Sequence, residues 1–215
     1  MRTVLILGSS GLVGQHLLAG ALADASIGQV VAPTRRPLPA HAKLLNPIVS
    51  YDALPAAAPW WRADAVLCAL GTTMAQAGSQ AVFRQVDHDY VMAAATLAQR
   101  AGTPVFVLNS SLGANVMSRA FYTRVKGEVE RDLGGLGFVS MTTVRPALLD
   151  GGPRPDKRRG ERIGLWLAHR LTWLIPARYR AVSTQAVAGC MLAAARGAAP
   201  GHHVVESEQI GPNGR

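Results

Sequence analysis

A tyrosine and a lysine four residues apart, Tyr122 and Lys126, could together exchange a proton near neutral pH. In a helix this spacing puts both side chains on one face, close enough for the ammonium to act on the phenol. A phenol alone titrates near pH ~10, and each unit of decrease in its pKa takes about 1.4 kcal/mol of preferential phenolate stabilisation. A neighbouring ammonium contributes to that stabilisation. The hydroxyl of Ser111 could orient a carbonyl or alcohol toward Tyr122.

The sequence GSSGLVG at residues 8–14 directly follows an apolar run at residues 4–7. This order predicts a buried strand, a tight turn and a helix. A glycine-spaced turn lets the backbone approach a pyrophosphate closely, and the free N–H groups at the start of the helix face its negative charge. A tight connection without a ligand would also fit the G-x-x-G-x-x-G spacing. We interpret it as a dinucleotide site because a βαβ pattern surrounds it.

The second strand of this unit, near residues 30–32, is followed by Thr34, Arg35 and Arg36. An acidic side chain at this position would bind the ribose 2′-hydroxyl of NAD, whereas arginine accommodates the 2′-phosphate of NADP. The guanidinium groups suit a phosphate, which accepts charge-assisted, bidentate hydrogen bonds. We therefore predict NADP(H) in preference to NAD(H) as the cofactor. A solvated pair of arginines is the alternative interpretation.

The elements that must position these residues alternate along the chain as strand and helix. We predict an α/β fold, a single domain with a doubly wound parallel sheet of the Rossmann type. Ligands of such sheets bind beyond the carboxyl ends of the strands, which places Gly71, Thr72 and Ser111 at the ligand edge. The predicted strands lie at residues 4–7, 30–32, 44–49, 63–70, 105–108, 138–144 and 204–205, and the predicted helices at residues 12–22, 80–100, 121–128 and 183–196.

Two groups of polar residues allow more than one assignment. Ser110 competes with Ser111 for the orienting role, because a shift of one residue in the end of the preceding strand exchanges them. Asp87, His88 and Asp89 interrupt the long helix predicted at 80–100. Since neighbours in sequence fan out around a helix, we expect these three to cap, pair or face solvent rather than to form a metal or acid–base cluster.

Length, charge and cysteine content limit the class of protein. A chain of 215 residues is long enough for one α/β domain with a substantial core. The net charge is +9, but the basic residues are spread without a nucleic-acid-binding motif, so we expect an anionic cofactor or substrate and no nucleic acid. Cys68 and Cys190 are predicted to be small buried side chains, with no metal site. No apolar run is long enough for secretion or a membrane span, so the cytoplasm is the expected compartment.

The segment 151–179 is rich in glycine, proline and arginine at first, and in tryptophan and aliphatic residues afterwards. We expect it to cover the active site, as core packing or as a substrate lid with an apolar wall. A homodimer contact and attachment to a membrane surface are the other interpretations. The domain thus divides into a cofactor-binding core at 1–150, a lid or interface segment at 151–180, and a C-terminal helix and strand at 181–215.

The order of the motifs GSSGLVG, TRR, CALGTT, SS, YTRVK and VRP resembles the short-chain dehydrogenase/reductase superfamily, in its atypical or extended form because of the glycine spacing. More narrowly, ADAVLCALGTT, QVDHDYV, LNSSLGAN and FYTRVKGEVE resemble the Tat-interacting-protein branch, which includes small bacterial homologues. The resemblance covers residues 1–145 and is weak beyond residue 151. The Asn-Asn-Ala-Gly signature of the ordinary subfamily is absent, and the substrate region is much shorter than in sugar-nucleotide epimerases.

This resemblance implies an NADP(H)-binding domain with a Ser-Tyr-Lys set. By position, Tyr122 would be the acid–base group, Ser111 the orienting hydroxyl, and Lys126 a ligand of the nicotinamide ribose. The cofactor-binding residues that it implies are Gly8, Ser10, Gly11, Leu12, Val13 and Gly14 for the pyrophosphate, Arg35 and Arg36 for the 2′-phosphate, Leu70, Gly71 and Thr72 for the adenosine side, and Lys126.

The function expected from these residues is hydride transfer between a nicotinamide and a carbonyl or alcohol carbon of a small-molecule substrate, with Tyr122 handling the proton. An intact Ser-Tyr-Lys set favours an enzyme. The alternatives are a regulatory or scaffold protein that binds NADPH without turnover, and an enzyme of the nucleotide-sugar epimerase or dehydratase kind. A homodimer partner is compatible with the segment 151–179.

Overall fold

Seven parallel strands form one sheet in the computed structural model, which describes residues 1–150 and 176–211. The strand order is β3-β2-β1-β4-β5-β6-β9, which confirms the predicted doubly wound α/β fold of a single domain. The sheet strands are β1 (Arg2–Leu7), β2 (Ile27–Val31), β3 (Leu44–Leu45), β4 (Ala65–Cys68), β5 (Val105–Asn109), β6 (Ser140–Arg145) and β9 (Gly201–Glu206), and a separate parallel pair consists of β7 (Leu149–Asp150) and β8 (Val182–Ser183).

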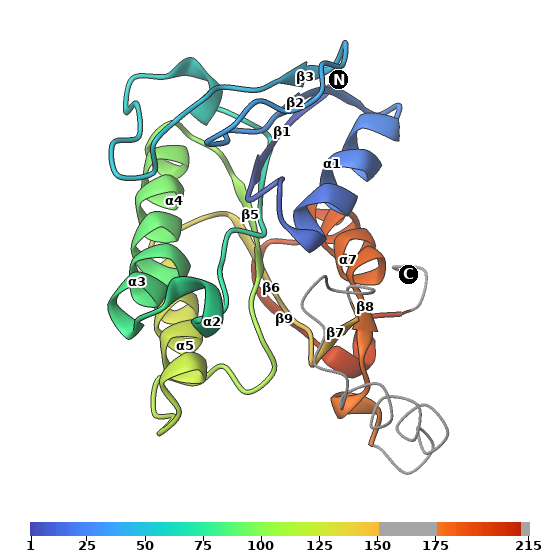
Figure 1. Ribbon diagram of the computed structural model, residues 1–215. Helices are drawn as coiled ribbons and strands as arrows, with labels where there is room; N and C mark the ends of the chain where they lie inside the picture. Colours follow the sequence, from blue (N-terminus) through green and yellow to red (C-terminus); the bar gives the residue numbers. More distant parts are fainter. Residues whose placement is uncertain (151–175, 212–215) are drawn as a thin grey trace.

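Helices cover both faces of the sheet (Figure 1). One face carries α1 and α7, which pack against each other, and the other carries α4 and α5. The α-helices are α1 (Leu12–Ala23), α2 (Met74–Ala77), α3 (Gln80–Arg84), α4 (Tyr90–Arg100), α5 (Phe121–Gly134) and α7 (Thr184–Gly197), with a π-helical turn at Gln85–Asp89 and short 3₁₀ turns at Pro59–Trp61, Ala177–Tyr179 and Ser207–Gln209.

The central strands are apolar on both faces because both faces are covered. Along β1, Val4 and Ile6 join the core beneath α1 and α7, whereas Leu5 and Leu7 join the core beneath α4 and α5. Successive side chains of a strand point to opposite faces, so each central strand contributes to both halves of the core. The continuous apolar runs of the sequence are therefore the signature of this two-sided sheet.

The carboxyl ends of the central strands meet at one edge of the sheet. Leu7 of β1 pairs with Cys68 of β4, and Cys68 pairs with Leu108 of β5. The chain continues from β1 to β2 on one side, while β4 lies on the other side, so the strand order reverses at β1. Open α/β sheets bind ligands in the crevice at such a reversal. The residues that follow β1, β4 and β5 therefore share the expected ligand edge.

Two local predictions differ from the structure. The helix predicted at 80–100 consists of α3, the π turn and α4. The strand predicted at 44–49 is limited to the two residues of β3, followed by an isolated bridge between Thr34 and Ile48. Leu12, the first residue of α1, is exposed because it lies beyond the end of β1. Both cysteines are free; Cys68 is buried as predicted, and Cys190 is partly buried.

Of the segment 151–179, which was predicted to cover the active site, residues 151–175 lie outside the described residues. Its last part contains the exposed 3₁₀ turn Ala177–Tyr179. Within residues 1–150 and 176–211, no helix has the length and apolar character needed to cross a membrane.

Candidate functional site

The turn between β1 and α1 requires glycine at two positions. Gly8 has a φ of +80°, and a Cβ there would lie 2.6 Å from the backbone of Ala69 and Leu70. A Cβ at Gly14 would lie 2.0 Å from the carbonyl oxygen of Gly8. Gly11 donates its N–H to the same carbonyl at 3.0 Å. The glycines therefore permit a backbone path that other residues would block.

The start of α1 fits an anion such as a pyrophosphate. Among the described residues no side chain caps the amino-terminal N–H groups of α1, and its first turn contains no acidic residue. These N–H groups and the positive end of the helix dipole attract negative charge. Ser10 and Leu12 are exposed here, whereas Val13 is buried in the core. Val13 can therefore contribute only its backbone to a ligand.

The loop after β2 is braced by Asn46, a residue that the motifs do not include. Its Nδ2 donates to the hydroxyl of Thr34 at 2.8 Å, and its Oδ1 accepts from the N–H of Leu38 at 2.8 Å. Thr34 in turn donates to the carbonyl of Arg36 at 2.6 Å. The loop backbone is thereby fixed, while the side chains of Arg35 and Arg36 are exposed.

Two tyrosines, one of them hydrogen-bonded to an aspartate, interact electrostatically with Arg35. The buried Tyr51 donates to the carbonyl of Pro33 at 3.3 Å, and its ring centroid lies 5.6 Å from that of Tyr90. Tyr90 donates to the carboxylate of Asp52. Burial raises the pKa of Tyr51, the hydrogen bond to Asp52 raises the pKa of Tyr90, and the charge of Arg35 opposes both increases. Arg35 is therefore within electrostatic reach of both phenols.

Helix α5 carries Tyr122 and Lys126 at the ligand edge. The side chain of Lys126 is 8% exposed, and Tyr122 is 37% exposed. The ring of Tyr122 packs against Phe83, with 5.4 Å between the centroids. Burial lowers the pKa of Lys126, whereas the facing Asp87 carboxylate and Tyr122 phenol raise it. The increase is larger than the decrease, so the pKa of Lys126 lies above its usual value. The site thus holds a buried ammonium beside a phenol that remains accessible.

Asp87 is the ion-pair partner of Lys126 and was not assigned a role from the sequence. Its Oδ1 lies 2.8 Å from Nζ of Lys126. The next two residues point elsewhere: His88 contacts Asp132 of α5 at 2.8 Å and Asp89 at 2.7 Å, and Asp89 is exposed. The three side chains diverge, as expected of neighbours on a helix. The sequence signal for Asp87 was a charged residue in an otherwise packing helix.

The two serines after β5 have different surroundings. Ser110 is buried, and its hydroxyl donates to Glu130 of α5. Glu130 also accepts from Arg145 of β6 at 2.5 Å, so Ser110 belongs to an ion-pair network. Ser111 is half-buried, and its hydroxyl lies 3.4 Å from the carbonyl of Leu112. Of the two hydroxyls, that of Ser111 is the one less firmly bound by the protein.

Residues 69–72 connect the glycine turn to the tyrosine and lysine of α5. Gly8 lies against the backbone of Ala69 and Leu70. The N–H of Thr72 donates to Oδ2 of Asp87 at 2.7 Å, and Asp87 pairs with Lys126. The structure therefore brings together the predicted residues that follow β1 and β4 and those of α5. Arg35 and Arg36 follow β2, which is the neighbour of β1 on the side away from β4.

The loop after Ser111 returns to α5 and lies unusually close to it. The N–H of Asn115 donates to the carbonyl of Thr123 at 3.0 Å. A Cβ at Gly127 would lie 2.3 Å from the backbone of Asn115, so glycine is needed where the loop crosses the helix. Gly127 directly follows the Y-x-x-x-K motif and was missed as a positioning residue.

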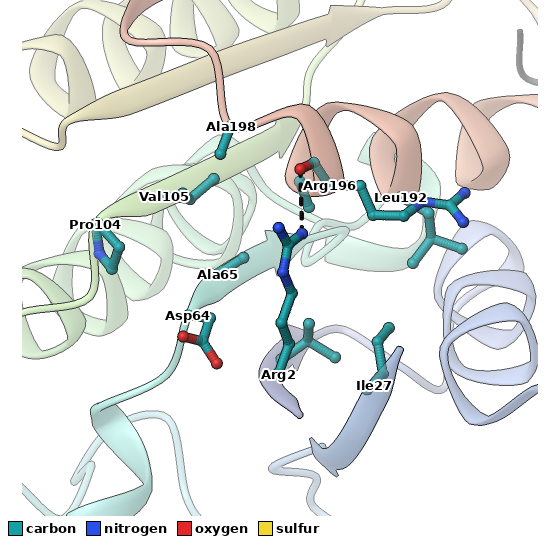
Figure 2. A pocket seen from close by; sticks show the side chains of 11 residues that line it. Arg2, Ile27, Asp64, Ala65, Pro104, Val105, Leu192, Arg196 and Ala198 are labelled. Atoms are coloured by element: carbon teal, nitrogen blue, oxygen red, sulfur yellow. Dashed lines mark hydrogen bonds between the residues drawn. The ribbon is translucent and has the colours of Figure 1, made fainter. Parts of the chain in front are cut away.

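A cavity of about 180 Å³ lies away from this site, near the amino-terminal ends of β1, β4 and β5 (Figure 2). Its lining is largely apolar, and Arg2 donates to the carbonyl of Arg196 at 3.1 Å. Asp64 at its rim accepts from the N–H of Thr3 at 2.6 Å. Since doubly wound sheets bind ligands at the opposite edge, we do not assign this cavity to the candidate site.

Curated relatives cover most of the chain. The protein "fmp52, mitochondrial" of Emericella nidulans is 35% identical over 179 residues, which are 80% of this chain and 76% of that protein. The protein HTATIP2 of Rattus norvegicus is 36% identical over 180 residues, which are 81% of this chain and 72% of that protein. The comparison with protein-family models finds no match.

These relatives correct the expected compartment. The fmp52 proteins of Emericella nidulans, Eremothecium gossypii and Aspergillus niger carry the word mitochondrial in their names, which contradicts the cytoplasmic prediction. That prediction rested on the absence of a long apolar run. Mitochondrial transit segments are amphipathic and rich in arginine and serine, so a search for apolar runs does not detect them.

Solved structures share the fold. MoeE5 in complex with UDP-glucose and NAD has a TM-score of 0.70 at 17% identity, covering 97% of this chain and 79% of that chain. WbmH from Bordetella bronchiseptica in complex with NAD⁺ has a TM-score of 0.67 at 17% identity, covering 96% and 76%. At such identities the likeness establishes the Rossmann-type fold alone. The identity shared with fmp52 and HTATIP2, on this fold, shows that the chain belongs to their family, an atypical branch of the short-chain dehydrogenase/reductase superfamily.

Proposed function

We propose that the chain is an NADP(H)-dependent oxidoreductase that interconverts a carbonyl and an alcohol on a small-molecule substrate. The observation that carries this proposal is the buried Lys126 ammonium on the same helix as the accessible Tyr122 phenol. Contacts through residues 69–72 connect this pair to the glycine turn after β1. A cofactor-binding turn and a proton-exchanging pair at one sheet edge are the two parts that such a reaction requires.

The glycine turn and the first turn of α1 would hold the pyrophosphate through backbone N–H groups. Gly8 and Gly14 support this role because a side chain at either position would collide with backbone atoms of the turn or of residues 69–70. Leu70, Gly71 and Thr72 would line the adenosine side, and Lys126 would bind the nicotinamide ribose. When bound, the reduced nicotinamide supplies the hydride.

Arg35 and Arg36 would bind the 2′-phosphate, which favours NADP(H) over NAD(H). Both side chains are exposed at the end of β2, on a loop whose backbone is held by Thr34 and Asn46. A fixed backbone with two exposed guanidinium groups is suited to bidentate recognition of a phosphate.

Tyr122 would donate a proton to the carbonyl oxygen as the carbon is reduced, and would accept it back in the reverse direction. Lys126 stabilises the phenolate that this transfer leaves, because an ammonium close to a phenol favours its charged form. Ser111 would donate a hydrogen bond to the same carbonyl oxygen and orient it toward Tyr122. Ser110 is unsuited to this role because its hydroxyl is bound to Glu130.

Calorimetric titration with NADPH and NADH tests the cofactor assignment. We expect the protein to bind NADPH more tightly than NADH. The change Arg35→Ala should weaken NADPH binding by roughly 10- to 100-fold, because it removes charge-assisted hydrogen bonds, and should change NADH binding little. Arg100→Ala is the matched control, since Arg100 is exposed at the far end of α4. Equal weakening of both nucleotides, or no binding of either, would contradict the assignment.

The change Tyr122→Phe tests the proposed reaction once a screen of carbonyl compounds has found consumption of NADPH. It should lower kcat by about 10²- to 10⁴-fold, because it removes the proton donor, and leave the affinity for NADPH unchanged. Full activity of this variant would contradict the role of Tyr122. Tight NADPH binding with no carbonyl substrate would instead support a binding protein without turnover.

A further inference from the structure

Asp87 forms a buried ion pair with Lys126, and the motif QVDHDYV, which contains Asp87, assigned it no such partner. The residue is 1% exposed, its Oδ1 lies 2.8 Å from Nζ of Lys126, and its Oδ2 accepts from the N–H of Thr72 at 2.7 Å. Removing two opposite charges from water is unfavourable unless the geometry is good and further hydrogen bonds satisfy the remaining atoms. Oδ2 of Asp87 is satisfied by a hydrogen bond and Oδ1 by the charge of the ammonium, so this pair comes close to that condition.

The π turn at Gln85–Asp89 carries Asp87, whose carboxylate contacts the segment after β4 and α5. A π turn holds one residue more than an α-helical turn, which changes the direction of the side chains within it. Asp87 is buried as a result, while His88 contacts α5 and Asp89 is exposed. Such turns are rare and are found frequently at functional sites.

Gly71 leaves the space that the ion pair occupies. A Cβ at this position would lie 2.9 Å from Oδ1 of Asp87 and 3.6 Å from Nζ of Lys126. Gly71 does not have a positive φ, so its backbone conformation would suit other residues. The close approach of the two charged groups is therefore the reason for glycine here. Three segments, after β4, in the π turn and in α5, are thus fitted to one another around the pair.

Among the described residues, the titratable groups that face the Lys126 ammonium are Asp87 from the π turn, Tyr122 from α5 and Cys68 from β4. Burial raises the pKa of Cys68 to about 12, so this thiol is neutral at physiological pH. Tyr122 is also neutral when it holds the proton that it would donate. Asp87 is therefore the anion that balances the ammonium while the site is ready to react.

We propose that Asp87 is the positioning residue of Lys126, holding its ammonium against the segment after β4 and beside the Tyr122 phenol. The proposal rests on the proposed function for the part that Lys126 plays in proton exchange. Asp87 acts through Lys126. Without the carboxylate, the effect of burial on the ammonium would lose its main opposition, which favours loss of the Lys126 proton or rotation of the side chain away from Tyr122.

The change Asp87→Asn tests this role because it removes the charge and keeps the shape. The chain contains three lysines, Lys43, Lys126 and Lys157, so protein labelled with carbon-13 in lysine gives few Cε signals, and Lys126→Arg assigns the one in question. We expect the Lys126 signal of Asp87→Asn to titrate at a lower pH than that of the wild type. We also expect about tenfold weaker binding of NADPH, because a displaced or neutral Lys126 binds the ribose less well.

Asp89→Asn is the matched control, since it makes the same change in the same π turn at an exposed carboxylate. It should leave both the Lys126 titration and the NADPH affinity unchanged. An Asp87→Asn variant that is less stable but has an unchanged Lys126 titration would show a purely structural role and overturn the proposal.

The wild-type protein provides a second measurement should Asp87→Asn fail to fold. A scalar coupling between Nζ of Lys126 and the carboxylate carbon of Asp87 is expected in NMR spectra, because the 2.8 Å between Nζ and Oδ1 is short enough for the ammonium to donate to the carboxylate. A Lys126 ammonium without this coupling would overturn the proposal. Failure of the proposed function is a separate result, namely no binding of NADPH by the wild type, and leaves the Lys126 titration interpretable.

Discussion

At the residue scale, the adjacent serines Ser110 and Ser111 after β5 have hydroxyls with different contacts. Ser110 donates to Glu130, which Arg145 also binds, whereas Ser111 lies beside the carbonyl of Leu112 at a distance near the limit of a hydrogen bond. Successive residues leaving a strand point in different directions. One position therefore stabilises the junction of β5, β6 and α5, and the next is available to a ligand.

The changes Ser111→Ala and Ser110→Ala should have opposite effects on activity and stability. Ser111→Ala should lower kcat by about 10²-fold, because it removes a donor to the carbonyl oxygen, with little change in the urea midpoint of unfolding. Ser110→Ala should leave kcat near the wild-type value and reduce the free energy of unfolding by about 1 kcal/mol or more, because Glu130 loses a buried partner. The reverse pattern would assign the orienting role to Ser110.

The residues of the candidate site could be predicted from the sequence where a single element fixes their relation. Tyr122 and Lys126 lie on one helix at a fixed spacing, so their shared face follows from helix geometry. Asp87 could not be assigned in this way. Its partner lies on another helix, and a π turn, which no apolar periodicity indicates, determines its direction.

At the element scale, the loop after β2 depends on Asn46, which lies after β3. The amide of Asn46 bridges Thr34 and Leu38, which flank the two arginines. The change Asn46→Ala should lower the free energy of unfolding by about 1–3 kcal/mol, because it leaves partly buried polar groups without a partner. It should also weaken NADPH binding while the arginines themselves are intact. Chemical denaturation and calorimetry measure the two effects, and an unchanged NADPH affinity would show that the arginines do not need this brace.

The close crossing of the loop after β5 over α5 marks the limit of element prediction. The sequence predicts β5 and α5, because each has its own apolar pattern, but gives no sign that Gly127 and Asn115 meet. A contact between a loop and a helix surface follows from three-dimensional packing, which no local periodicity describes. The two-residue strands β7 and β8 were missed for the same reason, since two residues have no period.

At the scale of the whole molecule, the parallel sheet and the positions of its strands could be predicted more fully than its ligand. Each predicted sheet strand is present. The central strands leave continuous apolar runs because both of their faces are covered. The parallel sheet then fixes which residues reach the ligand edge, since all its strands end there. Substrate choice depends on whatever lies over that edge, and the segment 151–175, which we predicted to cover it, is outside the described residues.

The free energy of unfolding should decrease at both low and high pH, because specific side chains change their charge there. A hydrogen bond from Arg131 holds the pKa of Asp132 below its usual 3.8, and hydrogen bonds from Ser26 do the same for the pKa of Asp24. A carboxylate whose pKa is lower in the folded state stabilises the fold above its unfolded pKa, and this contribution disappears as the pH falls through the folded value. The contribution of Lys126 to stability depends on pH in the opposite direction. Its pKa is raised above 10.5, so its contribution is present below that pH and is lost as the pH rises through the folded value.

Urea unfolding of the wild type and of Asp132→Asn across the pH range tests the acid side of this prediction. At neutral pH the variant should unfold at a lower urea concentration, because it lacks the carboxylate that Arg131 and His88 contact. The difference should shrink as the pH falls below about 4, where the wild-type carboxyl becomes protonated and loses the same interactions. If the difference in urea midpoint stays constant down to pH ~2, the amide destabilises the fold for steric reasons. The charge of Asp132 then contributes nothing to the loss of stability in acid.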